Sequence, residues 1–118
     1  MTETNQYNLE ERTYQFAKDV STYSKEIPRN PANIAYINQL IRTSSSIGAN
    51  YIEANESLSK KDFIMRIKIC RKEAKESAYW IKLIVETNTE SVTQKGWLLH
   101  DEAVELKKIF STIIRNSL

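Results

Sequence analysis

The strongest chemical signal in this 118-residue chain is a cluster of basic side chains between residues 60 and 75. Seven lysines and arginines stand there against two carboxylates, so the segment carries a local excess of five positive charges. Such a concentration is suited to binding phosphate groups. On a helix, at about 100° per residue, five of the lysines share a sector roughly 80° wide. The predicted nucleic-acid-binding residues are Lys61, Lys68, Arg71, Lys72, Lys75 and Lys82.

The same residues also fit a simpler structural role. A lysine-rich helix surface is often only solvated, and a pair such as Lys72 with Glu76, four residues later, would balance its charge. The whole chain has 17 basic and 15 acidic residues, and its net charge of +2 does not by itself indicate nucleic-acid binding. The sequence leaves both interpretations open.

Metal and nucleophile chemistry find little support in the residues. The only histidine is His100, and Trp97 stands where a di-iron Glu-x-x-His motif needs a glutamate. A zinc site lacks a second cysteine, and Cys70 occupies an apolar helix position that predicts a small buried hydrophobe. His100 is predicted to be an exposed helix residue. We therefore expect no metal, no cofactor and no small-molecule substrate.

A further group of polar residues lies beside the apolar positions of the two middle helices. Catalysis by paired carboxylates would need an acid and a base at a defined separation, and the spacing supplies no such pair. A hydrogen-bonded network between helices accounts for these residues better, and the chain is predicted not to be an enzyme. The group consists of Arg42, Asn50, Glu53, Arg66, Glu73 and Glu76.

Long helices are the elements expected to position these side chains. Two glycines and two prolines provide few turns, which argues against a β-sheet fold. Capping residues and prolines predict helices over 9–26, 31–57, from 60 to near 88, and 92–116, after a frayed tail at 1–7. Gly48, inside the second helix, predicts close approach of a neighbouring helix, and Gly96 leaves the start of the fourth helix open.

Four amphipathic helices with short connections predict an all-α, antiparallel up-down-up-down four-helix bundle, formed as one domain over residues 1–118. No run approaches the roughly 20 apolar residues of a membrane span. The N-terminal residues lack the charge and hydropathy pattern of a signal peptide. We expect a cytoplasmic protein without a membrane partner, in agreement with its single cysteine.

The third helix carries more apolar surface than a bundle core requires. One stripe with heptad-like spacing faces the core, and a second stripe lies beside it. The excess predicts either generous packing inside the bundle or self-association of the chain. Aromatic residues, which are enriched at interface centres, mark the second possibility. The predicted oligomer-interface residues are Met65, Ile69, Trp80, Leu83 and Trp97.

Segments of the middle helices resemble one known bacterial family. The stretch from Ser46 to Ala54, SIGANYIEA, looks like the signature of the 23S rRNA-intervening-sequence proteins. So do SKKDF from Ser59, RKEAKES from Arg71 and the pair Tyr79-Trp80. The segment ELKKIFSTII over 105–114 is similar to the last helix of that family. The resemblance covers nearly the whole chain in order.

The resemblance implies a left-handed up-down four-helix bundle assembled as a ring-shaped homopentamer. Some members of the family are encoded inside intervening sequences of 23S rRNA genes. A related branch, the accessory protein of diversity-generating retroelements, partners a reverse transcriptase and binds nucleic acid through a basic surface. Most members have no established activity.

Residues and resemblance together predict a non-enzymatic, oligomeric scaffold or adaptor. It would bind RNA or a ribonucleoprotein through the basic face of the third helix. The alternative is a protein–protein interaction module without a nucleic-acid role, favoured by the wide apolar surface of that helix and by the small net charge of the chain.

Overall fold

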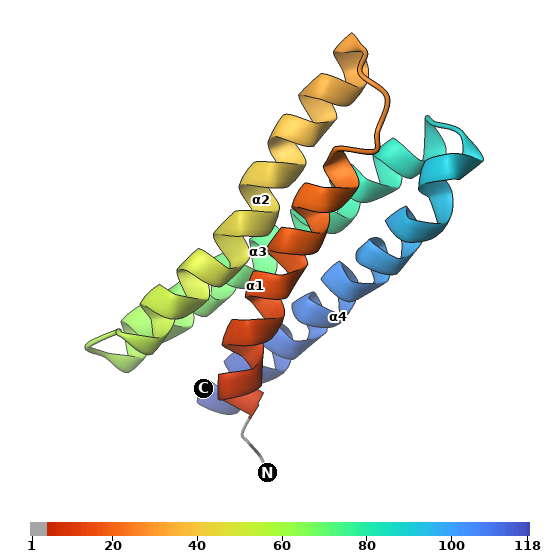
Figure 1. The fold of residues 1–118 in the computed structure, drawn as a ribbon. Helices are drawn as coiled ribbons and strands as arrows, with labels where there is room; N and C mark the ends of the chain where they lie inside the picture. Colours follow the sequence, from red (N-terminus) through yellow and green to blue (C-terminus); the bar gives the residue numbers. More distant parts are fainter. Residues whose placement is uncertain (1–4) are drawn as a thin grey trace.

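The computed structural model describes the backbone of residues 5–118 and the side chains of residues 9–118. Four long helices, α1 (Asn5–Ser24), α2 (Pro31–Asn55), α3 (Lys60–Glu86) and α4 (Thr93–Ser117), follow one another, with a short 3-10 helix, η1 (Glu90–Val92), before α4. None of the residues 5–118 lies in a β-strand. The helices alternate in direction (Figure 1), which confirms the predicted all-α antiparallel bundle. Of the predicted tail, residues 1–4 lie outside the described residues and residues 5–7 belong to α1.

Local capping signals set the starts of the two middle helices as predicted. The Asn30 side chain accepts a hydrogen bond from the backbone N–H of Asn33 at 2.8 Å, and Pro31 is the first residue of α2. The Ser59 hydroxyl accepts from the N–H of Asp62 at 3.1 Å and begins α3 in the same way. Both caps satisfy backbone donors that have no partner inside the helix.

Helix ends differ from the predictions by a few residues. α1 stops at Ser24 rather than 26, because the N–H groups of Lys25 and Glu26 bond three residues back and tighten the chain ahead of Pro28. α2 stops at Asn55 rather than 57. α4 begins at Thr93 and passes through Gly96 without a break, which settles the start that the sequence left open.

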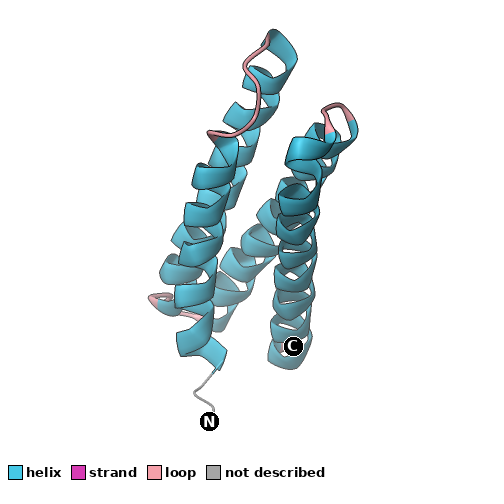
Figure 2. Cartoon of the chain, turned by 45° about the vertical axis from the view of Figure 1, so that its right-hand side comes forward, coloured by secondary structure: helices cyan, strands magenta, loops and turns pink. Residues whose placement is uncertain are grey.

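α3 lies at the centre of the helix packing. It packs against α2 and α4, while α1 closes the bundle against the same two helices. Figure 1 shows α1 in front of α3, and the turned view of Figure 2 shows the loops confined to the ends of the bundle. All four helices contribute to a continuous apolar core, whose fully buried members include Val20, Leu40, Ile47, Ile67, Ile81, Leu106 and Phe110.

Both glycines lie where two helices approach each other closely. A Cβ atom at Gly48 would lie 3.0 Å from the Thr13 hydroxyl of α1, as the sequence predicted for that position. A Cβ atom at Gly96 would lie 2.3 Å from Cγ2 of Val85 and 2.5 Å from the Tyr23 hydroxyl. Gly96 therefore permits the contact of α4 with both α1 and α3, a role that the sequence did not reveal.

Side-chain amides join two connections at the same end of the bundle. Asn33, at the start of α2, and Asn88, after α3, exchange hydrogen bonds of 2.8 and 2.9 Å. Asn33 also donates to the carbonyl of Pro28, and Asn88 donates to the carbonyl of Ile84. Asn33 is only 2% exposed, so this pair is a buried polar contact with its bonding capacity largely used.

Three apolar residues, Ile34, Ile41 and Leu58, are spaced in the sequence like the buried residues of the second helix, which predicts that they face the core, but they lie outside it. Ile34 and Ile41 are 41% and 37% exposed, because they stand at the edge of the stripe rather than at its centre. Leu58 is 99% exposed, because α2 ends before it and helical spacing no longer applies. No described helix has the length and hydropathy of a membrane span.

Candidate nucleic-acid interface

The predicted basic residues lie along one solvent-facing side of α3. The five lysines are all exposed, and Arg71 is half-buried at the edge of this side. At 1.5 Å per residue the lysines extend over about 32 Å of helix. We call them the lysine stripe, which consists of Lys61, Lys68, Lys72, Lys75 and Lys82.

No carboxylate among residues 9–118 forms an ion pair with the lysine stripe. The pair between Lys72 and Glu76, expected if the surface were simply balanced, is not formed. Glu76 instead lies 3.6 Å from the guanidinium of Arg42 on α2. The stripe thus presents ammonium groups to solvent without local neutralisation, which suits contacts with phosphate.

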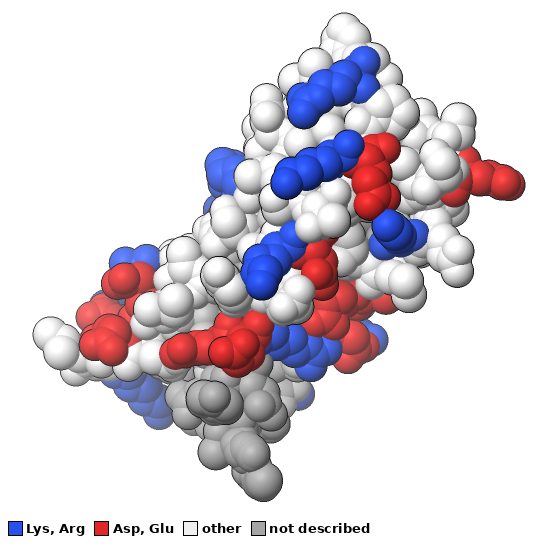
Figure 3. All heavy atoms as spheres, in the orientation of Figure 1, with Lys and Arg blue, Asp and Glu red and all other residues white. Residues whose placement is uncertain are grey.

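The side of the molecule around α1 differs from the lysine stripe. In Figure 3, basic and acidic side chains are interspersed on this side. Two ion pairs reach α4 from this side. Arg12 of α1 pairs with Glu102 at 2.7 Å, and Glu26, in the connection between α1 and α2, pairs with Lys95 at 2.9 Å. The hydrogen bond to Glu102 raises the pKa of Arg12 above its usual value. Cations on this side are therefore partly neutralised.

An exposed tyrosine interrupts the lysine stripe. Tyr79 is 60% exposed and follows Lys75 by four residues, while Lys82 follows it by three. Residues at these separations are neighbours on a helix surface. Sequence reasoning missed Tyr79, although the spacing that grouped the lysines also places this residue among them.

Two further aromatic rings, of Trp80 on α3 and Tyr36 on α2, continue the aromatic surface that begins at Tyr79. Its ring meets that of Trp80 at 5.1 Å in a T-shaped contact. Trp80 in turn stacks on Tyr36 of α2 at 6.2 Å with an angle of 29° between the ring planes. An aromatic series thus runs from α2 to the exposed side of α3, and it ends at the lysine stripe.

Surface hollows flank the lysine stripe on both sides. One lies between α2 and α3, and its lining includes Lys72, Lys75 and Tyr79. The other lies between α3 and the end of α4, where Lys61 and Lys68 stand beside Met65 and Leu118. Both hollows combine ammonium groups with apolar surface, a combination suited to phosphate and base contacts.

The predicted polar network forms between α2 and α3. Arg66 donates to the Asn50 side chain at 2.9 Å, and Arg42 lies 3.8 Å from Glu73. Two contacts not predicted extend this network: the Ser77 hydroxyl donates to that of Thr43 at 2.9 Å, and the Cys70 thiol donates to the carbonyl of Ile47 at 3.5 Å. The network therefore has the structural role that the sequence indicated. Glu53, also predicted to take part, is exposed and makes no side-chain hydrogen bond or ion pair within residues 9–118.

Glu73 is the most buried carboxylate among residues 9–118. It is 5% exposed, and its Oε1 has no hydrogen-bond partner among the described residues. The nearest cation is the guanidinium of Arg42 at 3.8 Å. Glu73 and Arg42 thus contribute to the contact between α3 and α2.

The predicted oligomer-interface residues lie in more than one place. Met65 is 54% exposed, and Ile69 and Leu83 are half-buried on α3. Trp80 packs against the core on the α2 side, and Trp97 packs against it from α4. Trp80 and Trp97 are thus partly buried by contacts inside the bundle, while Met65 remains available to another chain.

Cys70 and His100 differ in how they match the predictions. Cys70 is fully buried, as expected, and burial raises the pKa of its thiol to about 12. His100 was predicted to be exposed, but it is half-buried because its ring lies edge-on to Trp97 at 5.0 Å. Its Nδ1 lies 3.1 Å from the carboxylate of Asp101. The described residues contain no group of three potential metal ligands.

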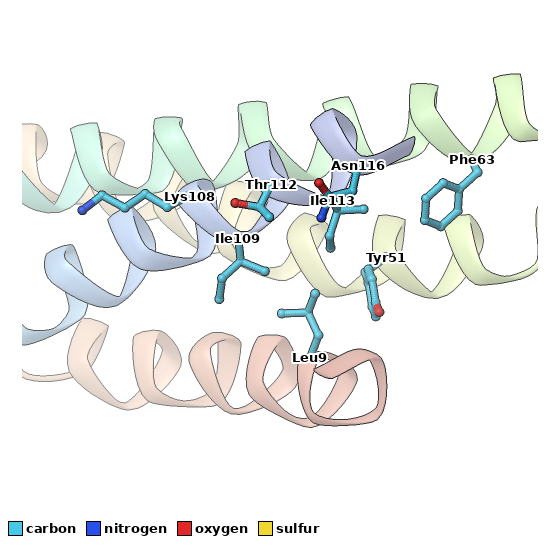
Figure 4. A pocket seen from close by; sticks show the side chains of 8 residues that line it. All are labelled: Leu9, Tyr51, Phe63, Lys108, Ile109, Thr112, Ile113 and Asn116. Carbon is cyan, nitrogen blue, oxygen red and sulfur yellow. The ribbon is translucent and has the colours of Figure 1, made fainter. Parts of the chain in front are cut away.

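A pocket at the end of the bundle where α1 begins is shown in Figure 4. Its apolar lining includes Leu9 from α1, Tyr51 from α2, and Ile109 and Ile113 from α4. The one ammonium group, on Lys108, pairs with Glu105 at 3.7 Å. None of the eight lining residues is a carboxylate, histidine or cysteine, and the lining is mainly apolar.

Comparisons with known proteins agree with the fold and with the resemblance. The model of a family described as 23S rRNA-intervening sequence protein matches residues 5–112. A solved structure from Bacteroides thetaiotaomicron, described as a protein with unknown function from the S23 ribosomal protein family, is 27% identical with a TM-score of 0.81. The match covers 93% of this chain and 97% of that one. No curated protein matched the sequence.

Proposed function

Because the chain belongs to the 23S rRNA-intervening sequence protein family, we propose that it is a non-enzymatic, oligomeric scaffold that binds RNA or a ribonucleoprotein through the lysine stripe of α3. The observation that carries the proposal is the row of exposed lysines without carboxylate partners among residues 9–118. Phosphate groups supply the missing negative charge and release counterions on binding. This proposal assigns the protein to the cytoplasm, where ribosomal RNA is found.

Changing Lys68, Lys72 and Lys75 together to glutamate should weaken RNA binding by at least about tenfold at low salt. The substitutions reverse the charge of the stripe where phosphates would lie. All three side chains are exposed, so the bundle should remain folded. Binding is measured by fluorescence anisotropy of labelled RNA at two salt concentrations, and circular dichroism checks the fold.

The matched control reverses three exposed charges elsewhere, at Lys18, Lys25 and Arg29. It changes the net charge by the same amount and should leave most of the affinity, apart from a uniform electrostatic loss. Equal losses in the two triple variants would mean that RNA responds only to total charge. Unchanged affinity in the stripe variant would remove the basis of the proposal.

The assembly part of the proposal gives a separate prediction. Light scattering behind a sizing column should give the mass of about five chains, the number that the family resemblance implies. Exposed apolar side chains such as Ile52 and Met65, 52% and 54% exposed, are available for contacts between copies. A monomer at both low and high salt would contradict the ring and the idea of repeated lysine stripes.

A point substitution connects this mass to the predicted interface. Met65→Glu should lower the mass, because a charge is then buried between chains. Leu98→Glu is the control, since Leu98 is 67% exposed on α4 and is outside the predicted interface. An unchanged mass with Met65→Glu would move the interface away from this part of α3.

A protein–protein interaction module without RNA remains a second candidate, supported by the exposed Met65 beside the lysines. A protein partner recovered from cells and retained after nuclease treatment would favour it. Loss of all bound material after nuclease treatment would favour the RNA scaffold.

A further inference from the structure

We propose that the lysine stripe recognises an unpaired RNA strand, with a base stacked on the ring of Tyr79 and the neighbouring phosphates held by Lys72, Lys75 and Lys82. This inference rests on the proposed function, because it specifies the form of RNA that the same surface takes. Tyr79 is the residue that distinguishes this surface from a purely electrostatic one.

The position of Tyr79 places an aromatic ring among the lysines of the stripe. Lys75 and Lys82 lie one helical turn before and after it, and Lys72 lies two turns before it on the same side. The four residues form a surface on which a flat apolar ring is surrounded by ammonium groups. Proteins that bind single strands combine such rings for the bases with cations for the backbone.

The Tyr79 ring is exposed enough to contact a base. Tyr79 is 60% exposed, and its hydroxyl has no hydrogen bond within residues 9–118. In a T-shaped contact only one ring uses its face, so at least one face of the Tyr79 ring is free of Trp80. That face is available to a base without any change in the bundle.

Neighbouring aromatic side chains hold the Tyr79 ring in place. Trp80 holds the edge contact with Tyr79 and is itself stacked on Tyr36 of α2. The Tyr79 ring is therefore positioned by Trp80, which Tyr36 of α2 supports in turn, and this lowers the entropy lost when a base stacks on the ring. Gln39 and Glu76, which line the adjacent hollow, offer hydrogen-bonding groups for the edge of such a base.

The geometry favours an unpaired strand over a duplex. Bases inside a duplex stack on one another and cannot offer a face to a protein ring, whereas unpaired bases can. An acidic protein segment would satisfy the lysines but would leave the ring of Tyr79 without a specific role. The ring is thus the observation that selects RNA with accessible bases.

The test compares two forms of one RNA on the full-length protein. A labelled strand of about 15 nucleotides without self-complementarity is used alone or annealed to its complement, within the site sizes of single-strand binders. The wild-type protein should bind the unpaired strand more tightly. Tyr79→Ala should weaken that binding roughly 5- to 150-fold and leave the affinity for the duplex nearly unchanged.

Two control variants separate stacking from other effects. Tyr79→Phe keeps the ring and should bind like the wild type. Tyr14→Ala removes a tyrosine of similar exposure, 65%, which has Lys18 near its ring but lies on α1, and it should have no effect.

Different outcomes separate the two proposals. If Tyr79→Ala binds both RNAs like the wild type while the triple lysine variant does not bind, recognition is electrostatic, and only the stacking inference fails. Equal or tighter binding of the duplex by the wild type has the same meaning. If neither RNA binds and polyglutamate binds at the lysine stripe instead, both the inference and the proposed function are wrong.

Discussion

Replacing Gly96 with alanine should lower the free energy of unfolding by about 1–3 kcal/mol, a large share of the stability of a small domain. The added Cβ would lie 2.3 Å from Cγ2 of Val85 and 2.5 Å from the hydroxyl of Tyr23. Atoms in ordinary contact are about 3.5–4.0 Å apart, so either α4 or the buried side chains of Val85 and Tyr23 must shift to make room. Denaturant unfolding followed by circular dichroism measures this loss.

Gly48→Ala is the matched control for this prediction. Its Cβ would meet atoms of Thr13 alone, with the hydroxyl at 3.0 Å and the Thr13 Cβ at 3.4 Å, and alanine is better than glycine in a helix by about 1 kcal/mol. The two effects should nearly cancel at Gly48. Equal destabilisation at both glycines would show that the close approach at Gly96 is not what limits that position.

A double variant identifies the atoms responsible. Tyr23→Phe removes one of the two close contacts, so Gly96→Ala should be less destabilising in that background than in the wild type. The Tyr23 hydroxyl also donates to the carbonyl of Val92, so Tyr23→Phe alone is the proper reference. Strict additivity of the two substitutions would assign the whole effect to Val85.

Modification of Cys70 by a thiol reagent should be at least roughly a thousandfold slower in the folded protein than in the unfolded chain. The reactive form is the thiolate, and burial raises the pKa of Cys70 from 9.0 to about 12, which lowers the thiolate fraction by that factor near neutral pH. Full burial adds a steric barrier. Absorbance after adding an aromatic disulfide, with and without denaturant, gives both rates.

The same shift makes stability depend on alkaline pH. Folding favours the neutral thiol, so its contribution is complete below pH 9.0 and is lost as the pH rises toward about 12. Tyr23 acts in the same direction, because burial raises its pKa from 10.0 to about 12. The free energy of unfolding should therefore fall over this window. In the thiol-labelling experiment described above, rapid modification of Cys70 in the native protein would contradict its assignment to a closed core.

Residue types with local effects made much of the fold predictable from sequence. Asn30 with Pro31, and Ser59, mark the starts of α2 and α3 because an N-cap acts on backbone groups only three residues away. The contacts of Gly96 and Asn33 were not predictable, because they depend on Val85, Tyr23 and Asn88, which are distant in the chain.

The candidate site shows the same division between local and tertiary information. Helical spacing alone placed the lysines on one side of α3, and it could have added Tyr79, since Lys75 and Lys82 are its neighbours at that spacing. Spacing could not show that Glu76 contacts Arg42 rather than Lys72, because that choice depends on where α2 lies. Spacing could also have indicated that Trp97 lies beside His100, since the two residues are three positions apart on α4.

The polar contacts between α2 and α3 also limit how far one helix can slide along the other. Displacing α3 by a single turn, about 5.4 Å, would separate Arg66 from Asn50 and Ser77 from Thr43 at once, and would take Glu73 away from Arg42. Described side chains form no such polar pairs between α3 and α4, where the shape of the contact at Gly96 has the same effect. One bundle thus fixes the axial position of its central helix twice, by chemical matching on one side and by steric fit on the other.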